Sequence, residues 1–400
     1  MSGTGAVIKV THVIAGLEAD GAENVLHRIT SRMDPARFQN EVISLTDLGP
    51  MAERLKDSGI AVRALGMKRG SANLLHLLRL AGWLKQSQPN IVQTWMYHAD
   101  LLGGIAARLA GKPVVWSIHH TSLDPGQNKR LTIWTARMCA LLSSRLPKRI
   151  VCVSEASRIV HAKFGYADRE MVVIPNGFDL REFYPDAEAR STLRRELGIS
   201  EETPLIGMAA RFHVQKGHRN FVAAAARLHA RMPQAHFVLC GKGVDSRNAE
   251  LMGWIKDGSA GLAGVCHVLG ARTDMRRFFG ALDIATSSSL TEAFPMAVGE
   301  AMACGTPCVV TNVGDSAMIV GDTGKVVAAE DPQALAEAWE ALLLAGSAAR
   351  KQFGDAARNR VEQQFDLGTI VERYQQLYRD VLGSPDASTA QQSSMASIVG

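Results

Sequence analysis

Short apolar runs alternate with longer segments of helical periodicity along most of the 400-residue chain. In the first half the runs predict buried strands, and the segments between them predict helices, for example over residues 21–33 and 72–87. The expected strands are residues 7–14, 40–46, 90–94, 113–118, 150–153 and 171–174. This alternation favours an α/β architecture in which a parallel sheet has helices on both faces.

A second series of strands and helices follows residues 174–185, which are rich in turn-forming residues and predict a linker. Its expected strands are residues 205–211, 236–241, 265–270, 282–288, 307–311 and 325–329. Asp331 and Pro332 suit the cap and first position of a helix over 333–345. Two Rossmann-like halves therefore face each other across a cleft, and ligands of such sheets bind at the carboxyl ends of the strands.

The length exceeds what one hydrophobic core usually holds, so two domains are expected. We place the first at residues 1–182 and the second at residues 183–365. Apolar residues recur with a helical period through 367–382, which predicts a last helix. Residues 384–400 are rich in Ser, Ala and Gln and predict a disordered tail.

Composition points to a globular protein of the cytoplasm. Hydrophobic residues make up 46% of the chain and charged residues 21%, which is ordinary for a soluble domain. No apolar run reaches the roughly 18 residues of a membrane span, and the first apolar stretch lacks the basic region of a signal peptide. The six cysteines are expected to be free, and the pair Cys304 and Cys308 lacks the companions of a metal site.

Charge is distributed unevenly between the two halves. Residues 1–182 hold 23 basic residues and 15 acidic ones, whereas the remainder holds 21 and 24. The segment 129–150 mixes Trp134 and other apolar residues with basic ones near both ends. This pattern predicts weak docking on an anionic membrane surface, with an ordinary core helix as the equal alternative.

The richest candidate site is residues 286–314, where Glu292 and Glu300 stand eight positions apart around an apolar run. Phe294-Pro295 predicts the start of a helix, because proline at the first helical position loses no needed N–H group. The free amides of that turn favour an anion. Both carboxylates are then expected to line one wall of a cleft beside a phosphate site.

A second candidate is the pair of cations Arg211 and Lys216, which follow the strand over 205–211. A diphosphate leaving group needs positive charge or a metal ion to stabilise it. The chain contains no D-x-D motif of the kind that often holds such a metal. Arginine can grip two phosphate oxygens, and lysine supplies a point charge.

Two further candidates lie in the first half. Gly16 and Gly21 flank a loop after the first strand, where glycine lets the backbone approach a phosphate. The spacing fails the dinucleotide fingerprint, although Asp47 after the second strand keeps a weak dehydrogenase alternative open. His119 and its neighbour His120 follow the strand over 113–118, at the expected edge of the cleft.

These motifs together resemble the retaining glycosyltransferases of family 4, which have the GT-B fold. The resemblance rests on the two glutamates with EAMACGTPCVVT, on the R-x4-K-G element, and on the histidine at position 119. The first loop departs from the family pattern, since Asp20 replaces one of two paired glycines. The family's last helix crosses back to the first domain, and residues 366–383 are expected to do so here.

The resemblance also implies roles for individual residues. Glu292 and His119 are expected to contact the donor sugar, and Glu300 the ribose hydroxyls. Arg211 and Lys216 would stabilise the leaving diphosphate. Gly16 and the amides near Phe294 and Pro295 would complete the donor site, with no metal and no cofactor beyond the nucleotide sugar.

The expected function is transfer of a sugar from a nucleoside diphosphate donor, a UDP-sugar above others. The acceptor is expected to be a glycan or lipid-linked glycan of a cell-surface polysaccharide, and nucleic acid is not expected as a partner. The protein would work in the cytoplasm or at the inner face of the membrane. A sugar-nucleotide epimerase and a non-catalytic nucleotide-binding partner are the alternatives, and front-face and covalent routes to retention both remain open.

Overall fold

The computed structural model describes residues 6–18, 21–68, 73–123, 129–257 and 262–383. It divides into two compact units. Unit 1 combines residues up to Pro175 with the chain from Leu367 onward, and unit 2 is Asn176–Asp366. The division falls at residue 175, within the turn-rich linker and before the expected boundary at 182. Asp20 and the expected disordered tail, residues 384–400, lie outside the described residues.

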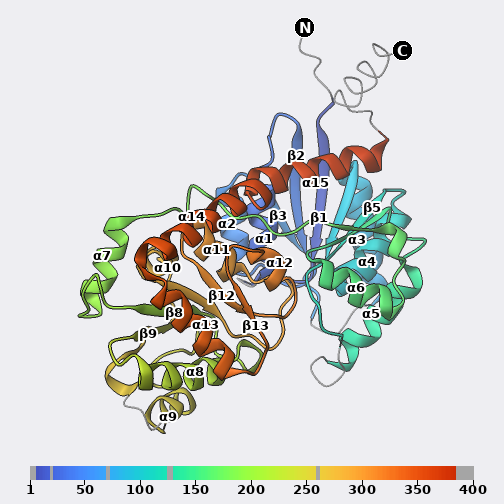
Figure 1. Cartoon of the computed structure of the whole chain (residues 1–400). Helices are drawn as coiled ribbons and strands as arrows, with labels where there is room; N and C mark the ends of the chain where they lie inside the picture. The colour runs from blue at the N-terminus through green and yellow to red at the C-terminus, as the bar shows by residue number, and fades with distance from the viewer. Residues whose placement is uncertain (1–5, 19–20, 69–72, 124–128, 258–261, 384–400) are drawn as a thin grey trace, which may run out of the picture. The chain divides into compact units, whose positions relative to one another are not determined.

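Unit 1 contains a parallel sheet of seven strands in the order β3-β2-β1-β4-β5-β6-β7 (Figure 1). The strands are β1 (Ile8–Ile14), β2 (Phe38–Ser44), β3 (Ala61–Ala64), β4 (Ile91–Trp95), β5 (Val114–Ile118), β6 (Arg149–Cys152) and β7 (Met171–Val173). The prediction of a parallel sheet is confirmed. Strand β3 was not predicted, because the sequence AVRA at this edge has no extended apolar run.

Helices cover both faces of the first sheet, each packed on its own apolar core. One face carries α1 (Gly21–Thr30), α2 (Met51–Asp57) and α15 (Leu367–Leu382). The other carries α3 (Leu74–Ser87), α4 (Tyr97–Leu109), α5 (Arg130–Leu142) and α6 (Glu155–Phe164). In a parallel sheet of this kind every connection is a helix or loop crossing from one end to the other, so the helices begin at the strands' carboxyl ends.

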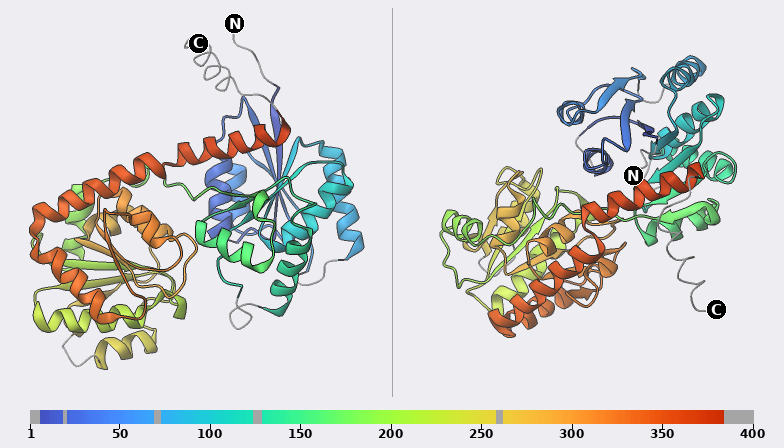
Figure 2. Two further views of the ribbon diagram at one scale, coloured as in Figure 1. Left: turned by 45° about the vertical axis from the view of Figure 1, so that its right-hand side comes forward. Right: turned by 90° about the horizontal axis from the view of Figure 1, so that it is seen from above.

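The last helix, α15, packs on unit 1 although it follows unit 2 in sequence (Figure 2). Its residues Ile370, Tyr374 and Tyr378 are buried in the core beneath β1 and β4. Tyr374 stacks on Trp95 with ring centroids 6.5 Å apart, and the Tyr378 hydroxyl donates a hydrogen bond to Gln93. The expected crossing of the C-terminal helix back to the first domain is confirmed.

Unit 2 contains a parallel sheet of six strands in the order β10-β9-β8-β11-β12-β13. The strands are β8 (Leu205–Ala209), β9 (His236–Cys240), β10 (Cys266–Val268), β11 (Ile284–Ser287), β12 (Cys308–Thr311) and β13 (Lys325–Val327). The helices are α7 (Ala187–Glu196), α8 (His218–Arg231), α9 (Ala249–Asp257), α10 (Met275–Ala281), α11 (Met296–Ala303), α12 (Ser316–Val320), α13 (Pro332–Leu344) and α14 (Gly346–Gln364). Phe221, Phe237 and Trp339 pack together in its core.

Candidate active site

The loop between β8 and α8 is fastened to the end of β11. The Leu290 amide donates a hydrogen bond of 2.8 Å to the Gln215 carbonyl, and the Ser288 hydroxyl donates one of 3.0 Å to the Gly217 carbonyl. Gly217 has a φ of +66°, and a Cβ added there would lie 1.9 Å from the Ser288 carbonyl oxygen. Only glycine fits this left-handed, crowded position. The turn at Gly217 therefore fixes the backbone position of Lys216, the residue before it.

Lys216 and Glu292 meet at the carboxyl edge of the second sheet. The Lys216 ammonium lies 2.5 Å from Glu292 Oε1, and the Ser289 hydroxyl donates a hydrogen bond of 2.7 Å to the same oxygen. Their side chains are 24% and 12% exposed, so the pair is shielded from water yet reachable. The structure therefore joins two predicted site residues that lie 76 positions apart in the sequence.

Arg211 stands at the same edge, two residues after β8 ends, and its side chain is exposed. Within the described residues it has no ion-pair or hydrogen-bond partner. An exposed guanidinium with no internal partner keeps its donors available for a bidentate anion. The predicted pair of cations thus divides into one that is engaged by Glu292 and one that is not.

The helix that follows Glu292 begins one residue later than expected. Helix α11 starts at Met296, and Pro295 takes the cap position with a ψ of 102° rather than the first helical position. The reason is packing, because the Phe294 ring is buried against Phe178 and Phe365, at centroid distances of 5.9 and 5.8 Å. Glu300 lies inside this helix and is partly buried.

Gly16 and His119 belong to unit 1, and the structure describes each at the carboxyl end of a strand. A Cβ on Gly16 would lie 3.1 Å from the Thr46 hydroxyl, so a larger residue would be crowded there. His119 shares a hydrogen bond of 2.8 Å with the Ser117 hydroxyl and stacks on Trp95 at 5.1 Å. Burial lowers the pKa of His119 to about 4, so its ring is neutral near pH 7.

Among the described residues, no group of three or more His, Cys, Asp or Glu side chains is arranged to hold a metal ion. No helix in the described ranges is both long enough and apolar enough to span a membrane. All six cysteines are free.

Two Rossmann-like units, each with a parallel sheet, are the architecture of the GT-B class of glycosyltransferases. The second unit also carries cations and a carboxylate at the ends of its strands. Comparisons with known proteins support this classification. The family described as Glycosyltransferase Family 4 matches residues 19–182, and the family described as Glycosyl transferases group 1 matches residues 203–345. The chain belongs to the group 1 glycosyltransferases of family 4, and it is a glycosyltransferase.

Several characterised relatives are similar over nearly their whole length. The Escherichia coli UDP-Gal:α-D-GlcNAc-diphosphoundecaprenol α-1,3-galactosyltransferase is 25% identical over 397 residues, which cover 96% of this chain and 99% of the relative. A Campylobacter jejuni N,N'-diacetylbacillosaminyl-diphospho-undecaprenol α-1,3-N-acetylgalactosaminyltransferase is 25% identical over 86% of this chain and 92% of the relative. The crystal structure of Anabaena HepE in complex with UDP has a TM-score of 0.82 at 22% identity, covering 93% of this chain and all of that chain.

Proposed function

We propose that the protein transfers a sugar from a UDP-sugar to a glycan carried on a polyprenyl diphosphate lipid, with retention of configuration. The observation that carries this proposal is the Lys216–Glu292 pair at the strand ends of unit 2. In this pair, Lys216 offers a cation to a diphosphate, and Glu292, which it contacts directly, offers a carboxylate to sugar hydroxyls. The lipid-diphosphate acceptor is supported by the printed activities of the Escherichia coli and Campylobacter jejuni relatives.

In the proposed reaction, the bond between the sugar's anomeric carbon and the β-phosphate oxygen breaks, and its electron pair goes to the departing UDP. The acceptor hydroxyl oxygen forms the new bond on the same face, and its proton passes to the departing phosphate. Arg211 and Lys216 stabilise the charge that grows on the leaving group. Glu292 and His119 hold the sugar hydroxyls, and Glu300 holds the ribose.

A panel of sugar nucleotides tests the reaction class. Purified protein is incubated with each donor alone and then with a polyprenyl-diphosphate-linked saccharide, and released UDP and sugar are followed by chromatography. Transfer predicts slow UDP release from the right donor alone and rapid release with the acceptor. Interconversion of the donor sugar would instead identify an epimerase, and no turnover with any donor and acceptor would favour a non-catalytic nucleotide-binding protein.

Replacing Glu300 with alanine is expected to weaken binding of UDP itself. A carboxylate that accepts hydrogen bonds from the ribose hydroxyls contributes roughly 1.5–3 kcal/mol, which corresponds to a loss of about 10- to 100-fold in Kd. Titration calorimetry with UDP measures the change, and Glu337→Ala, on the exposed face of α13, is the matched control. Unchanged UDP affinity in the Glu300 variant would remove this residue from the donor site.

Chelation is expected to leave the rate of transfer largely unchanged. The chain lacks the D-x-D motif and offers Arg211 and Lys216 to the diphosphate in place of a metal. Initial rates with EDTA, with Mg²⁺ and with Mn²⁺ are compared on the same enzyme. A loss of more than tenfold in EDTA that Mg²⁺ or Mn²⁺ restores would contradict a metal-independent mechanism.

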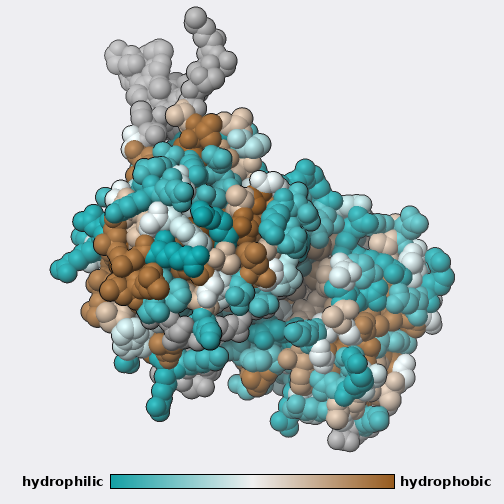
Figure 3. Space-filling model, turned by 180° about the vertical axis from the view of Figure 1, so that it is seen from behind, coloured by the Kyte–Doolittle hydropathy of each residue, from teal (hydrophilic) through white to brown (hydrophobic). Residues whose placement is uncertain are grey.

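Docking on the membrane face is proposed as the way in which unit 1 meets its lipid-linked acceptor. One side of helix α5 buries Ile133, Ala136 and Cys139 in the core, as expected of an ordinary core helix. Its other side exposes apolar residues: Leu131 is 50% exposed, Trp134 55% and Leu141 71%. Figure 3, which views the molecule from the side opposite to Figure 1, shows that apolar residues also gather on that face of unit 1.

Charge on α5 and in the segment after it complements an anionic leaflet. Residues 129–150 contain no acidic residue, and exposed basic side chains lie at Lys129, Arg130 and Arg137 at or in the helix and at Arg145 and Lys148 after it. Arg149 is exposed as well but forms an ion pair of 3.0 Å with Glu170. Basic residues near an anionic surface contribute about 1 kcal/mol each, and salt screens this attraction. Apolar side chains at the same surface add to binding.

Co-sedimentation with vesicles is expected to show binding to anionic vesicles at low salt, much weaker binding at high salt, and little binding to neutral vesicles. A variant with serine at Leu131, Trp134 and Leu141 should lose most of this binding. Leu344→Ser is the control, because Leu344 is equally exposed, at 74%, but lies in unit 2. Equal binding to neutral and anionic vesicles at low salt would end the proposal and favour a soluble acceptor.

A further inference from the structure

The two ring nitrogens of His119 have different surroundings at the carboxyl end of β5. The Nε2 atom shares a hydrogen bond of 2.8 Å with the Ser117 hydroxyl. The Nδ1 atom has no hydrogen-bond partner among the described residues, and it is not one of their buried unpartnered atoms, so solvent reaches it. Nδ1 is therefore the atom of this half-buried side chain that a ligand at the strand end can contact.

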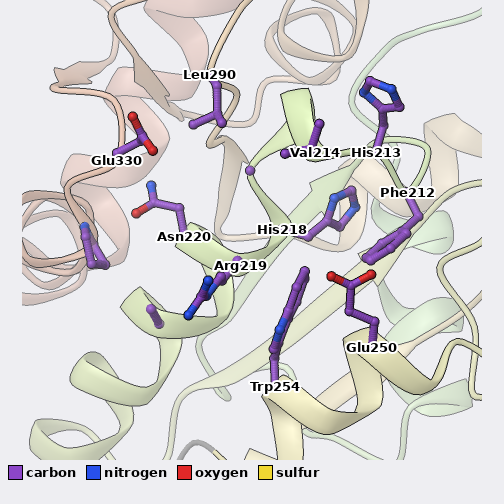
Figure 4. Close-up of a pocket in the computed structure, with 13 residues that line it drawn as sticks. Phe212, His213, Val214, His218, Arg219, Asn220, Glu250, Trp254, Leu290 and Glu330 are labelled. Atoms are coloured by element: carbon purple, nitrogen blue, oxygen red, sulfur yellow. The ribbon is translucent and has the colours of Figure 1, made fainter.

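His218 of unit 2 provides a contrast, because it is buried without such an arrangement. Figure 4 shows it beside Phe212, whose ring centroid lies 5.2 Å from that of His218. Burial lowers the pKa of both histidines to about 4, so both rings are neutral near pH 7. Neither nitrogen of His218 has a partner among the described residues, and both are closed to solvent. Of the two rings, only His119 has one nitrogen that is held and one that is open.

The hydroxyl protons near Nε2 determine which tautomer His119 adopts. Ser117 is fully buried, and its hydroxyl has hydrogen bonds with His119 Nε2 and with the Tyr374 side chain of α15. Burial raises the pKa of Tyr374, so its hydroxyl keeps the proton. This hydroxyl has no other hydrogen-bond partner among the described residues, and a buried O–H group without an acceptor is costly. Tyr374 therefore donates to Ser117.

The Ser117 hydroxyl then donates its own proton to His119 Nε2. A neutral imidazole carries one N–H group and one bare nitrogen, so with Nε2 accepting, the proton is on Nδ1. In the opposite arrangement Nε2–H would donate to Ser117 and Ser117 to Tyr374, which would leave the Tyr374 proton buried without an acceptor. The open nitrogen of His119 is therefore a hydrogen-bond donor.

The plane of the His119 ring is set by Trp95. The two rings stack with a centroid distance of 5.1 Å and an interplanar angle of 19°. Trp95 is itself fixed, because its Nε1–H group donates a hydrogen bond of 3.2 Å to the buried His12. Met96, the next residue, has a φ of 71° and a ψ of 158°, a strained conformation that is nearly confined to glycine and clusters at functional sites. The donor on Nδ1 is thus oriented before a ligand binds.

We propose that Ser117 is a positioning residue that holds His119 as the Nδ1–H tautomer, so that His119 offers its ligand a neutral hydrogen-bond donor. The proposal rests on the proposed function, in which His119 contacts a hydroxyl oxygen of the donor sugar. A neutral ring whose open nitrogen already carries a proton binds an acceptor oxygen and does not take a proton from the incoming hydroxyl. That proton is then left to the departing phosphate, as in the proposed reaction.

Nitrogen-15 NMR of the full chain, labelled at histidine, tests the tautomer directly. The variant His119→Asn identifies the signals of His119 among those of the 12 histidines. We expect the wild-type ring at pH 7 to be protonated at Nδ1, and Ser117→Ala to shift it toward the Nε2–H form. The signals of His218 should not change in the serine variant. Protonation at Nε2 in the wild type, or an unchanged tautomer in Ser117→Ala, would overturn the proposal.

Kinetics measure the consequence for transfer. Ser117→Ala is expected to lower kcat/KM for the donor by about three- to tenfold, the usual effect of one hydrogen bond, and to leave the Kd for UDP unchanged. Ser143→Ala is the matched control, because Ser143 is a buried serine of unit 1 at the end of α5, with a hydrogen bond of 2.7 Å to the Ala140 carbonyl. Its loss should leave kcat/KM unchanged, and an equal fall in both variants would show a general loss of stability.

Two substitutions of His119 distinguish its two nitrogens. The amide nitrogen of asparagine is two bonds from Cβ, as Nδ1 is, whereas that of glutamine is three bonds away, as Nε2 is. His119→Asn should therefore retain more of kcat/KM than His119→Gln, and the reverse order would contradict an Nδ1 donor. The NMR measurement needs no turnover. An Nε2–H ring in an enzyme that transfers sugar would refute this proposal alone, whereas a wild type without transfer would refute the proposed function and leave the tautomer standing.

Discussion

Lys216→Ala is expected to lower kcat by about 10²- to 10³-fold and to weaken donor binding as well. Loss of one preorganised charge that stabilises a leaving group typically has this effect on the rate. The additional loss of affinity comes from Glu292, whose Oε1 atom contacts the Lys216 ammonium at 2.5 Å. Without the lysine, the Glu292 carboxylate, whose side chain is only 12% exposed, faces an incoming diphosphate with no ammonium beside it.

Arg211→Ala provides the comparison. Arg211 is exposed and has no partner among the described residues, so its removal leaves no internal charge uncompensated. We expect kcat to fall while the Kd for the donor changes much less, because the guanidinium acts mainly on charge that develops in the transition state. The two variants therefore differ in affinity more than in rate.

Steady-state kinetics and calorimetry on both variants measure this difference. Lys351→Ala is the matched control, since Lys351 forms an ion pair of 2.6 Å with Asp355 on the exposed surface of α14. Exposed pairs of this kind contribute little to stability, and its loss should leave kcat and Kd unchanged. A Lys216 variant with normal kcat would exclude the lysine from leaving-group stabilisation.

The parallel sheets could be predicted because strands buried on both faces read as continuous apolar runs. Strand β8, with the sequence LIGMA, and strand β9, with the sequence HFVLC, are of this kind, since all but one residue of each is buried. The edge strand Ala61–Ala64 escaped prediction because half of its residues are exposed. The order of strands in each sheet also needed the structure, because pairing depends on contacts between segments far apart in sequence.

The candidate site was predictable in its residues but not in their contacts. The motif spacing identified Lys216 and Glu292 separately, whereas their ion pair depends on how the Gly217 turn fits against Ser288. The position of Pro295 was predicted wrongly by one residue. The prediction used only the preference of proline for the first helical position, whereas the burial of the neighbouring Phe294 depends on tertiary contacts.

Glu292→Gln is expected to separate binding of the nucleotide from binding of the sugar. The substitution keeps the shape of the side chain and removes its charge, so the Lys216 ammonium loses the counter-ion that it contacts in the structure. Bare UDP should then bind more tightly, by roughly fivefold, if the pair contributes on the order of 1 kcal/mol. Transfer should become much slower, because the carboxylate no longer orients the sugar hydroxyls.

Calorimetry with UDP and kinetics with the donor sugar measure these opposite effects on one variant. Ser289→Ala serves as its control, because it removes the second hydrogen bond to Glu292 Oε1 but leaves both charges in place. The control should therefore show little change in UDP affinity. If Glu292→Gln weakens UDP and UDP-sugar equally, the carboxylate contacts the nucleotide rather than the sugar. The assignment of Glu292 to the sugar rests on a rise in UDP affinity together with a fall in the rate of transfer, since loss of stability alone would weaken UDP binding as well.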